Sequence, residues 1–210
     1  MAANGTSLPV MEATTGGKSI GNYGLIVIIG LVTYDYGGTI GWASAITAAQ
    51  WNTLYAYQLK YGVRMVHLDG YPGSFNGTTI AANGPNGCCT SEEQSVSLTS
   101  TTFIPTAGLK VSNLSSIGLW HYPATITDPT TTTSFLTFAA NTEFNTATVA
   151  GVLQNFAGRQ QMVFFIEGAS WSLTSNYLGH VWFHWGYRGL YNGFRRVALH
   201  MQSLLLAFQN

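Results

Sequence analysis

The sequence predicts an α/β fold: a parallel βαβ sheet core of flavodoxin-like character with an inserted β-rich, sandwich-like segment. Two observations favour this class. A strand–helix–strand succession lies within residues 23–69, and such a unit forms a parallel strand pair with a right-handed crossover. Residues 70–150 are rich in Gly, Ser, Thr and Pro and hold short alternating stretches, which favours short strands separated by turns. We expect a polar lead-in over 1–22, the first part of an α/β domain over 23–69, the β-rich insertion over 70–150 and a return to the α/β domain over 151–210.

The first α/β part contains three clear local patterns. Residues 25–32 form a largely β-branched apolar run, which predicts a strand buried on both faces. Thr47 and Gln50 have the spacing of a capping box, and Gly62 stands where a helix C′ residue is expected. A second buried strand is predicted over residues 63–68.

The later segments carry weaker patterns. Within the insertion we expect short strands at 93–98, 118–122 and 134–138. After it we expect a short helix over 148–156 and a buried strand over 161–166. A last helix is predicted to begin at Trp171 and end near Gly189, with one apolar stripe made by Tyr177, Val181 and Trp185.

The composition excludes several classes of partner. Charged residues are 8% of the chain and the formal net charge is +0, whereas nucleic-acid binding requires a basic surface. The longest apolar run is far below the ~20 residues that span a bilayer. The abundance of Thr, Ser, Asn, Gly and Tyr is typical of secreted glycan-handling proteins, and equally of β-rich extracellular domains in general.

Three features bear on the compartment. N-x-[ST] sequons at Asn4, Asn76 and Asn113 indicate candidate glycosylation sites in an extracellular or cell-wall-associated protein, and the first residues show no signal-peptide pattern. The adjacent Cys88 and Cys89 either form a vicinal disulfide, which is strained and rare, or remain two free thiols. Both alternatives stay open.

Few residues suggest catalysis or a cofactor. His180 and His184 are four positions apart on an expected helix, which suits a metal site, but no third ligand lies nearby and the H-E-x-x-H pattern is absent. Asp69 ends a predicted strand, at the edge where α/β folds gather functional groups. No phosphate-binding loop or nucleophile elbow occurs. We expect no cofactor, and a structural role is the simpler interpretation of both histidines and of Asp69.

Aromatic residues outside the predicted core are the strongest positive signal. A flat ring can stack on the apolar face of a sugar while Asp, Asn or His beside it binds the hydroxyl groups. The alternative is that each ring belongs to the core. The candidate carbohydrate-binding residues are Trp42, Asp69, Tyr71, Trp120, His121, Tyr122 and Trp171.

Several collinear stretches resemble one protein family. They are residues 21–29, 45–58, 62–69, 71–73, 87–89, 118–124, 171–178, Arg188-Gly-Leu and Arg195-Arg-Val. Together they are similar to the secreted fungal galactosaminogalactan deacetylases, polysaccharide deacetylases also described as extracellular serine-rich proteins. The similarity runs from residue 21 to about residue 202 and covers the region that in this family precedes the metal-dependent deacetylase domain.

The resemblance implies an extracellular protein that binds or positions a galactosamine-containing polysaccharide of the cell wall or biofilm. The family carries two aspartates after the Arg-Arg segment and a Gln, whereas here Gln202 is followed by Ser203, Leu204 and Leu205. The expected function is therefore a non-catalytic, carbohydrate-associated segment. Two alternatives are an enzyme with an unrecognised metal site at His180, His184 and Asp69, and a degenerate paralogue that binds no sugar.

Overall fold

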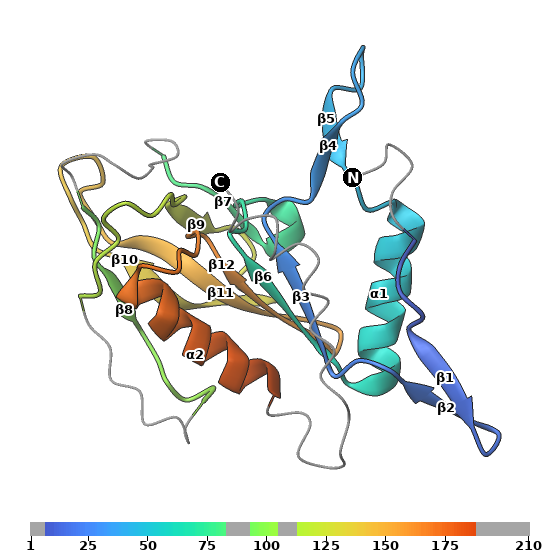
Figure 1. Ribbon diagram of the computed structural model, residues 1–210. Helices are drawn as coiled ribbons and strands as arrows, with labels where there is room; N and C mark the ends of the chain where they lie inside the picture. The colour runs from blue at the N-terminus through green and yellow to red at the C-terminus, as the bar shows by residue number, and fades with distance from the viewer. Residues whose placement is uncertain (1–6, 83–92, 105–112, 188–210) are drawn as a thin grey trace.

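The computed structural model describes residues 7–82, 93–104 and 113–187. Its main feature is a mixed sheet of eight strands, with the order β3-β6-β12-β11-β10-β8, from which β9 and β7 branch at β11 (Figure 1). Two separate hairpins, β1–β2 and β4–β5, project from the body. The elements are β1 (Glu12–Thr15), β2 (Lys18–Gly21), β3 (Leu25–Ile29), β4 (Thr33–Asp35), β5 (Trp42–Ser44), α1 (Ala48–Tyr61), β6 (Arg64–Leu68), a 3₁₀ turn (Ser74–Asn76), β7 (Thr78–Ile80), β8 (Val96–Leu98), β9 (Ala124–Ile126), β10 (Thr132–Phe138), β11 (Thr148–Phe156), β12 (Arg159–Phe164) and α2 (Leu173–Tyr187).

The predicted fold class is wrong. In the described part of the chain strand residues outnumber helical ones, and they form a β-rich, sandwich-like module rather than a parallel flavodoxin-like core. Among the described strands, parallel pairing is confined to β3, β6 and β12, whereas β12, β11, β10 and β8 follow one another antiparallel. The strand–helix–strand pattern was taken as the core of the fold and the β-rich part as an insertion, but the pattern describes only one end of a larger mixed sheet.

Local capping interactions set where helix α1 begins and ends. The Thr47 side chain accepts a hydrogen bond from the Gln50 backbone N–H, and the Gln50 side chain accepts one from the Thr47 N–H, so both halves of the predicted capping box are present. Gly62 ends the helix at φ 64°, in the left-handed region that glycine adopts without strain. Gln58 then ties the helix to the sheet, because its buried Nε2 donates to the carbonyl oxygens of Val63 and Gln160.

Strand β3 is present but is not buried on both faces. It is the edge strand beside β6, so only Ile26 is buried and Ile29 is 36% exposed. An apolar run fits an edge strand covered by a helix as well as it fits a central strand, and the sequence pattern does not separate the two cases.

The predicted helix over 148–156 is wrong, since this segment is the longest strand of the described chain, β11. It pairs with both β10 and β12. Close packing explains the glycine at position 151: a Cβ atom there would lie 2.9 Å from the Phe135 ring and 3.0 Å from the Val163 carbonyl oxygen. A larger residue would not fit between these groups without a shift.

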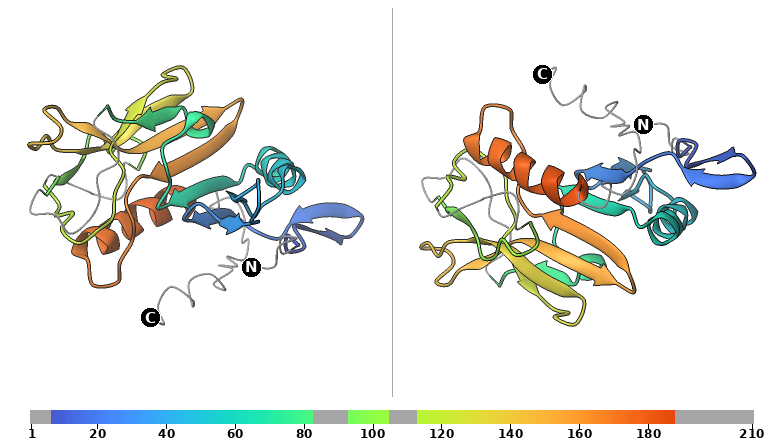
Figure 2. Two further views of the ribbon diagram at one scale, coloured as in Figure 1. Left: turned by 90° about the horizontal axis from the view of Figure 1, so that it is seen from above. Right: turned by 90° about the horizontal axis from the view of Figure 1, so that it is seen from below.

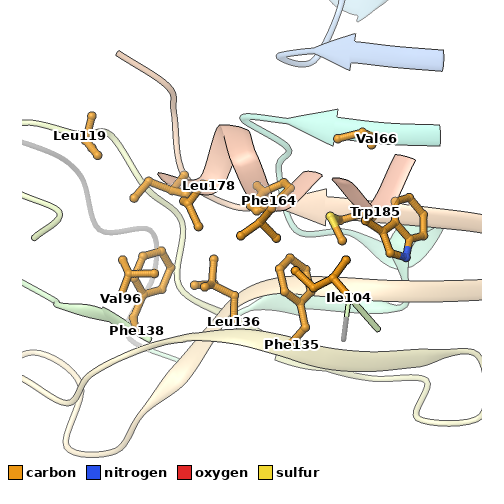
Figure 3. Close-up of a cluster of buried hydrophobic side chains, with 14 residues drawn as sticks. Val66, Val96, Ile104, Leu119, Phe135, Leu136, Phe138, Phe164, Leu178 and Trp185 are labelled. Carbon is orange, nitrogen blue, oxygen red and sulfur yellow. The ribbon is translucent and has the colours of Figure 1, made fainter. Parts of the chain in front are cut away.

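The two helices cover opposite faces of the sheet (Figure 2). Met65 packs in a cluster with Leu54 and Tyr57 of α1, whereas the next residue, Val66, packs against α2, as alternation along a strand requires. The larger cluster joins α2 to strands of the sheet (Figure 3) and contains buried Phe135, Leu136, Phe138, Phe164, Leu178, Val181 and Trp185 among others. The predicted apolar stripe of α2 therefore packs largely in the hydrophobic core.

Some predicted segments fall elsewhere. The stretch expected as a polar lead-in contains the β1–β2 hairpin, which an ion pair between Glu12 and Lys60 links to α1. Strand β8 lies within the expected strand 93–98 and β10 contains the expected strand 134–138, while 118–122 contributes a single bridge, from His121 to Ile166. In the described part of the chain no helix has the length and apolar character needed to cross a bilayer.

Candidate carbohydrate-binding site

Two acidic residues lie where the parallel strands end. Asp69 directly follows β6, and Glu167 follows β12 after a short extension. The strand ends are joined by hydrogen bonds from the Gly30 N–H to the Leu68 carbonyl (2.8 Å) and from the Gly70 N–H to the Phe164 carbonyl (2.7 Å). Because the carboxyl ends of parallel strands meet at one edge, both carboxylates are brought to that edge.

An extended segment crosses the same edge and supplies aromatic rings. The Tyr122 N–H donates to the Phe165 carbonyl, and the Glu167 N–H donates to the Trp120 carbonyl, both at 2.8 Å. Side chains alternate along extended backbone, so Trp120 and Tyr122 lie on one side of the segment and His121 on the other. Sheet pairing thus places Trp120 and Tyr122 beside the acidic residues.

Three rings form a continuous group. The Tyr71 and Tyr122 rings meet edge to face with centroids 5.0 Å apart, and the Trp120 and Tyr122 centroids are 6.3 Å apart at 71°. Trp120 is 43% exposed, while the two tyrosines are half-buried. The tyrosines therefore support an indole that reaches solvent. We call Asp69, Tyr71, Trp120, Tyr122 and Glu167 the ring site.

The electrostatics of the ring site centre on Asp69. Burial, and secondarily the negative charge of Glu167, raise the pKa of Asp69 from 3.8 to about 6. Its Oδ1 atom is buried without a hydrogen-bond partner, and its backbone is left-handed at φ 55°. Burial and the charge of Asp69 also raise the pKa of the Tyr122 phenol, against a hydrogen bond from Trp120 that lowers it. The ring site thus carries negative charge, and the Asp69 carboxyl group is partly shielded from solvent.

Comparison with known proteins identifies the family. The family model described as Agd3 CBM87 matches residues 1–185. This chain belongs to the Agd3 CBM87 family of carbohydrate-binding modules. Among solved structures, the crystal structure of Agd3, described as a novel carbohydrate deacetylase, matches with a TM-score of 0.82 and 51% sequence identity over 92% of this chain. The CBM87 chain spans 29% of the length of that protein.

One further solved structure shows a weaker similarity. The crystal structure of a cold-adapted β-galactosidase from Rahnella sp. R3 matches 76% of this chain and 22% of its own, with a TM-score of 0.48 and 10% identity, which is too low to support an argument. No curated protein was found to match the chain. The predicted resemblance to the non-catalytic N-terminal region of a polysaccharide deacetylase is confirmed by the family model and the Agd3 structure.

The remaining candidate residues lie outside the ring site, and His121 belongs to the core. His121 is 2% exposed. Its Nδ1 donates to the Leu119 carbonyl at 2.8 Å, its ring lies 4.8 Å from that of Phe138, and burial lowers its pKa. The position of His121 is therefore that of a core residue, in contrast to its two neighbours.

The two other tryptophans are exposed outside the ring site. Trp171 is 65% exposed and lies against Gly118, where an added Cβ would be 2.8 Å from its Cη2 atom. Trp42 is 72% exposed and stands on the β4–β5 hairpin. The structure thus brings Asp69, Tyr71, Trp120 and Tyr122 together. Trp42 and Trp171 take no part in the ring contacts of this group.

The histidine pair lies on the exposed side of α2 in the CBM87 module. The His180 and His184 rings are 4.2 Å apart, but within residues 7–82, 93–104 and 113–187 no group of three His, Cys, Asp or Glu side chains is placed to hold a metal ion. The pair therefore has no described third ligand.

The modification candidates have different positions. Asn76 is 1% exposed, and its Nδ2 donates to the Tyr71 carbonyl, so this nitrogen is not presented to solvent and instead holds the loop beside the ring site. Asn113 is exposed. Asn4, Cys88 and Cys89 lie outside the described residues, so their predicted glycosylation and pairing stay predictions.

Glu167 is the member of the ring site that sequence reasoning missed. It follows the predicted strand 161–166 in the same way that Asp69 follows the strand 63–68. Applying the strand-end rule to both strands would have found it.

Proposed function

We propose that this CBM87 module binds an extracellular, partly acetylated, galactosamine-containing polysaccharide at the ring site. One observation carries the proposal: Trp120 meets the Tyr122 ring edge to face, Tyr122 is in turn packed against Tyr71, and Trp120 is still 43% exposed, beside two carboxylates. The family of carbohydrate-binding modules and the 51% identical relative described as a carbohydrate deacetylase support it. We further propose that the protein is extracellular or cell-wall-associated.

The chemistry of the ring site suits a sugar that carries both hydroxyl and amino groups. The indole of Trp120 offers a flat apolar face to a pyranose ring, and the Glu167 and Asp69 carboxylates accept hydrogen bonds from hydroxyl groups. A deacetylated unit carries an ammonium group, which gains further from carboxylates in a partly desolvated setting. The ring site therefore accommodates acetylated and free-amine units through different contacts.

The proposed role is binding and positioning of polymer rather than its deacetylation. The stretch after Gln202 reads Ser203, Leu204 and Leu205, where the resembling family has two aspartates. We therefore expect no acetate release from acetylated galactosamine or glucosamine oligomers, with or without zinc. Turnover that disappears in His184→Ala would contradict this.

The binding test compares Trp120→Ala with wild type by calorimetric titration. The ligands are partly deacetylated galactosaminogalactan and a fully acetylated galactosamine oligosaccharide. Stacking on aromatic rings contributes about 1–3 kcal/mol per contact in nucleic-acid binding, and a wetter sugar face falls near the low end. We therefore expect an affinity loss of about five- to tenfold. With the acetylated ligand the loss persists in high salt, since stacking involves no ion pair.

The matched control is Leu59→Ala, because Leu59 is 54% exposed on α1 and belongs to no ring contact of the site. It should bind as wild type does. Each variant is first shown to melt cooperatively. Unchanged affinity of Trp120→Ala for both ligands would remove the ring site as the binding surface.

A further inference from the structure

The β4–β5 hairpin begins at the edge that carries the ring site. The chain leaves β3 at Gly30, whose N–H bonds to the Leu68 carbonyl, one residue before Asp69. A Cβ atom on Gly30 would lie 3.8 Å from Asp69 Oδ2. A hydrogen bond from the Ala45 N–H to the Val32 carbonyl closes the base of the hairpin, and the hairpin then projects away from the sheet (Figure 1).

One face of this hairpin repeats the chemistry of the ring site. The register pairs Asp35 with Trp42 and Thr33 with Ser44, and directly paired residues share a face of an antiparallel ribbon. All four residues are exposed, and Trp42, at 72%, is the most exposed tryptophan of the chain. The face therefore combines an indole with a carboxylate and the Thr33 hydroxyl, which is a composition for a polar, ring-shaped ligand.

The hairpin is held in shape by its other face and its tip. Tyr34 and Tyr36 meet edge to face with centroids 5.0 Å apart, and the Tyr36 hydroxyl donates to the Ser44 carbonyl at 3.2 Å. At the tip, the Gly37 N–H donates to Asp35 Oδ1 at 2.9 Å. These contacts hold the hairpin that carries Trp42 and also hold the Asp35 carboxylate, so little backbone freedom is lost when a ligand binds here.

We propose that Trp42 and Asp35 form a second sugar subsite, which engages the same polysaccharide chain beyond the ring site. This inference rests on the proposed function. Trp42 lies three residues beyond Ala45, about 10 Å along the strand, on a hairpin that projects from the edge where Asp69 lies. A chain that extends from the ring site to the hairpin contacts both, whereas an oligosaccharide too short to span them contacts the ring site alone. Affinity then rises with chain length, because the second contact is made by a ligand already held.

The test titrates acetylated galactosamine di- and trisaccharides, and separately the long polymer, against three variants. Trp42→Ala should weaken polymer binding by about five- to tenfold and leave the short ligands unchanged. Trp42→Phe, which keeps a ring, should retain most of the polymer affinity. Trp120→Ala should weaken binding of both the short and the long ligands.

Ile40→Ala is the matched control, because Ile40 is 67% exposed in the turn of the same hairpin and is not one of the paired residues that form the Trp42 face. It should behave as wild type. The subsite is refuted if Trp42→Ala binds the polymer normally, if it weakens short and long ligands equally, or if Ile40→Ala gives the same loss, which would point to an apolar protein contact. Binding of neither ligand by wild type would instead refute the proposed function, and the subsite with it.

Discussion

Replacing Asp69 with Asn should stabilise the folded chain at neutral pH. Asp69 carries a charge where it is costly, since burial and Glu167 raise its pKa from 3.8 to about 6 and its Oδ1 has no partner. Asn has nearly the same shape and is also tolerated in the left-handed backbone region that Asp69 adopts at φ 55°. The substitution therefore removes the charge and changes little else.

The magnitude follows from the pKa. A difference of about two pKa units, at 1.36 kcal/mol each, gives about 3 kcal/mol as an upper limit. The side chain is only half-buried, so solvent screening reduces the expected gain in the free energy of unfolding to about 1–2 kcal/mol. In a chain of this size that corresponds to a rise in Tm of about 2–8 °C.

The pH dependence gives the sharper test. Between pH 3.8 and about 6 the unfolded chain has released this proton while the folded chain retains it. The stability of wild type relative to the Asn variant therefore falls as the pH rises through this window, and the cost is complete above it. Urea denaturation at pH 7 should show the full gain for Asp69→Asn, and denaturation near pH 4 should show almost none.

The control is Asp35→Asn, the same substitution at an exposed position, which should change stability little at either pH. A gain for Asp69→Asn that is equal at pH 4 and pH 7 would show that it arises from the backbone and not from the charge. No gain at pH 7 would show that the carboxylate is solvated well enough to ionise without cost, and would refute the reasoning.

Two other substitutions test the local structure by urea denaturation. Gly77→Ala should destabilise the fold by about 2–4 kcal/mol, because Gly77 has φ 64° and an added Cβ would lie 2.2 Å from Thr132 Oγ1; Gly38→Ala, with φ 54° and open space around it, should lose less, and equal losses would mean that the Thr132 contact relaxes freely. Thr47→Ala should cost about 1 kcal/mol by removing the N-cap of α1, while Thr47→Ser should retain stability; if both variants unfold like wild type, the capping box contributes nothing.

The sequence predicted correctly what depends on neighbours in the chain. The capping box at Thr47 and the C-terminal Gly62 act within one or two turns of a helix, so their spacing was sufficient. Strand β3 was predicted from a largely β-branched run, and β6 and β12 from short segments with apolar centres next to turn residues. These are local rules, and they hold whichever fold contains them.

The errors concern partners that are distant in the chain. β11 was wrongly predicted as a short helix. Its nine residues carry no clear helical or strand period, and they form a strand because β10 and β12 pair with them on both sides. The antiparallel continuation of the sheet beyond β12 is likewise set by pairing that no short pattern encodes. A β-rich module was therefore mistaken for an α/β fold.

The candidate site shows the same division. Asp69 was found because it ends a strand, and the rings were found because they stand outside predicted core stripes. Nothing in the sequence placed residues 119–122 across the edge of β12, since that depends on the hydrogen bonds from Tyr122 to Phe165 and from Glu167 to Trp120. The same crossing places Trp120 and Tyr122 on one side and the core residue His121 on the other. The sequence of residues 120–122 alone does not reveal which side is buried.

Asp69 links the stability of the module to its proposed function. A left-handed backbone and a poorly solvated carboxylate both cost free energy, and here both occur in one residue. An asparagine would avoid the electrostatic part of this cost, so the carboxylate is explained by what it offers a ligand. An ammonium group bound at the ring site would offset the repulsion from Glu167 and so favour the ionised carboxylate of Asp69. The Asn variant should therefore be more stable and, with partly deacetylated polymer, the weaker binder.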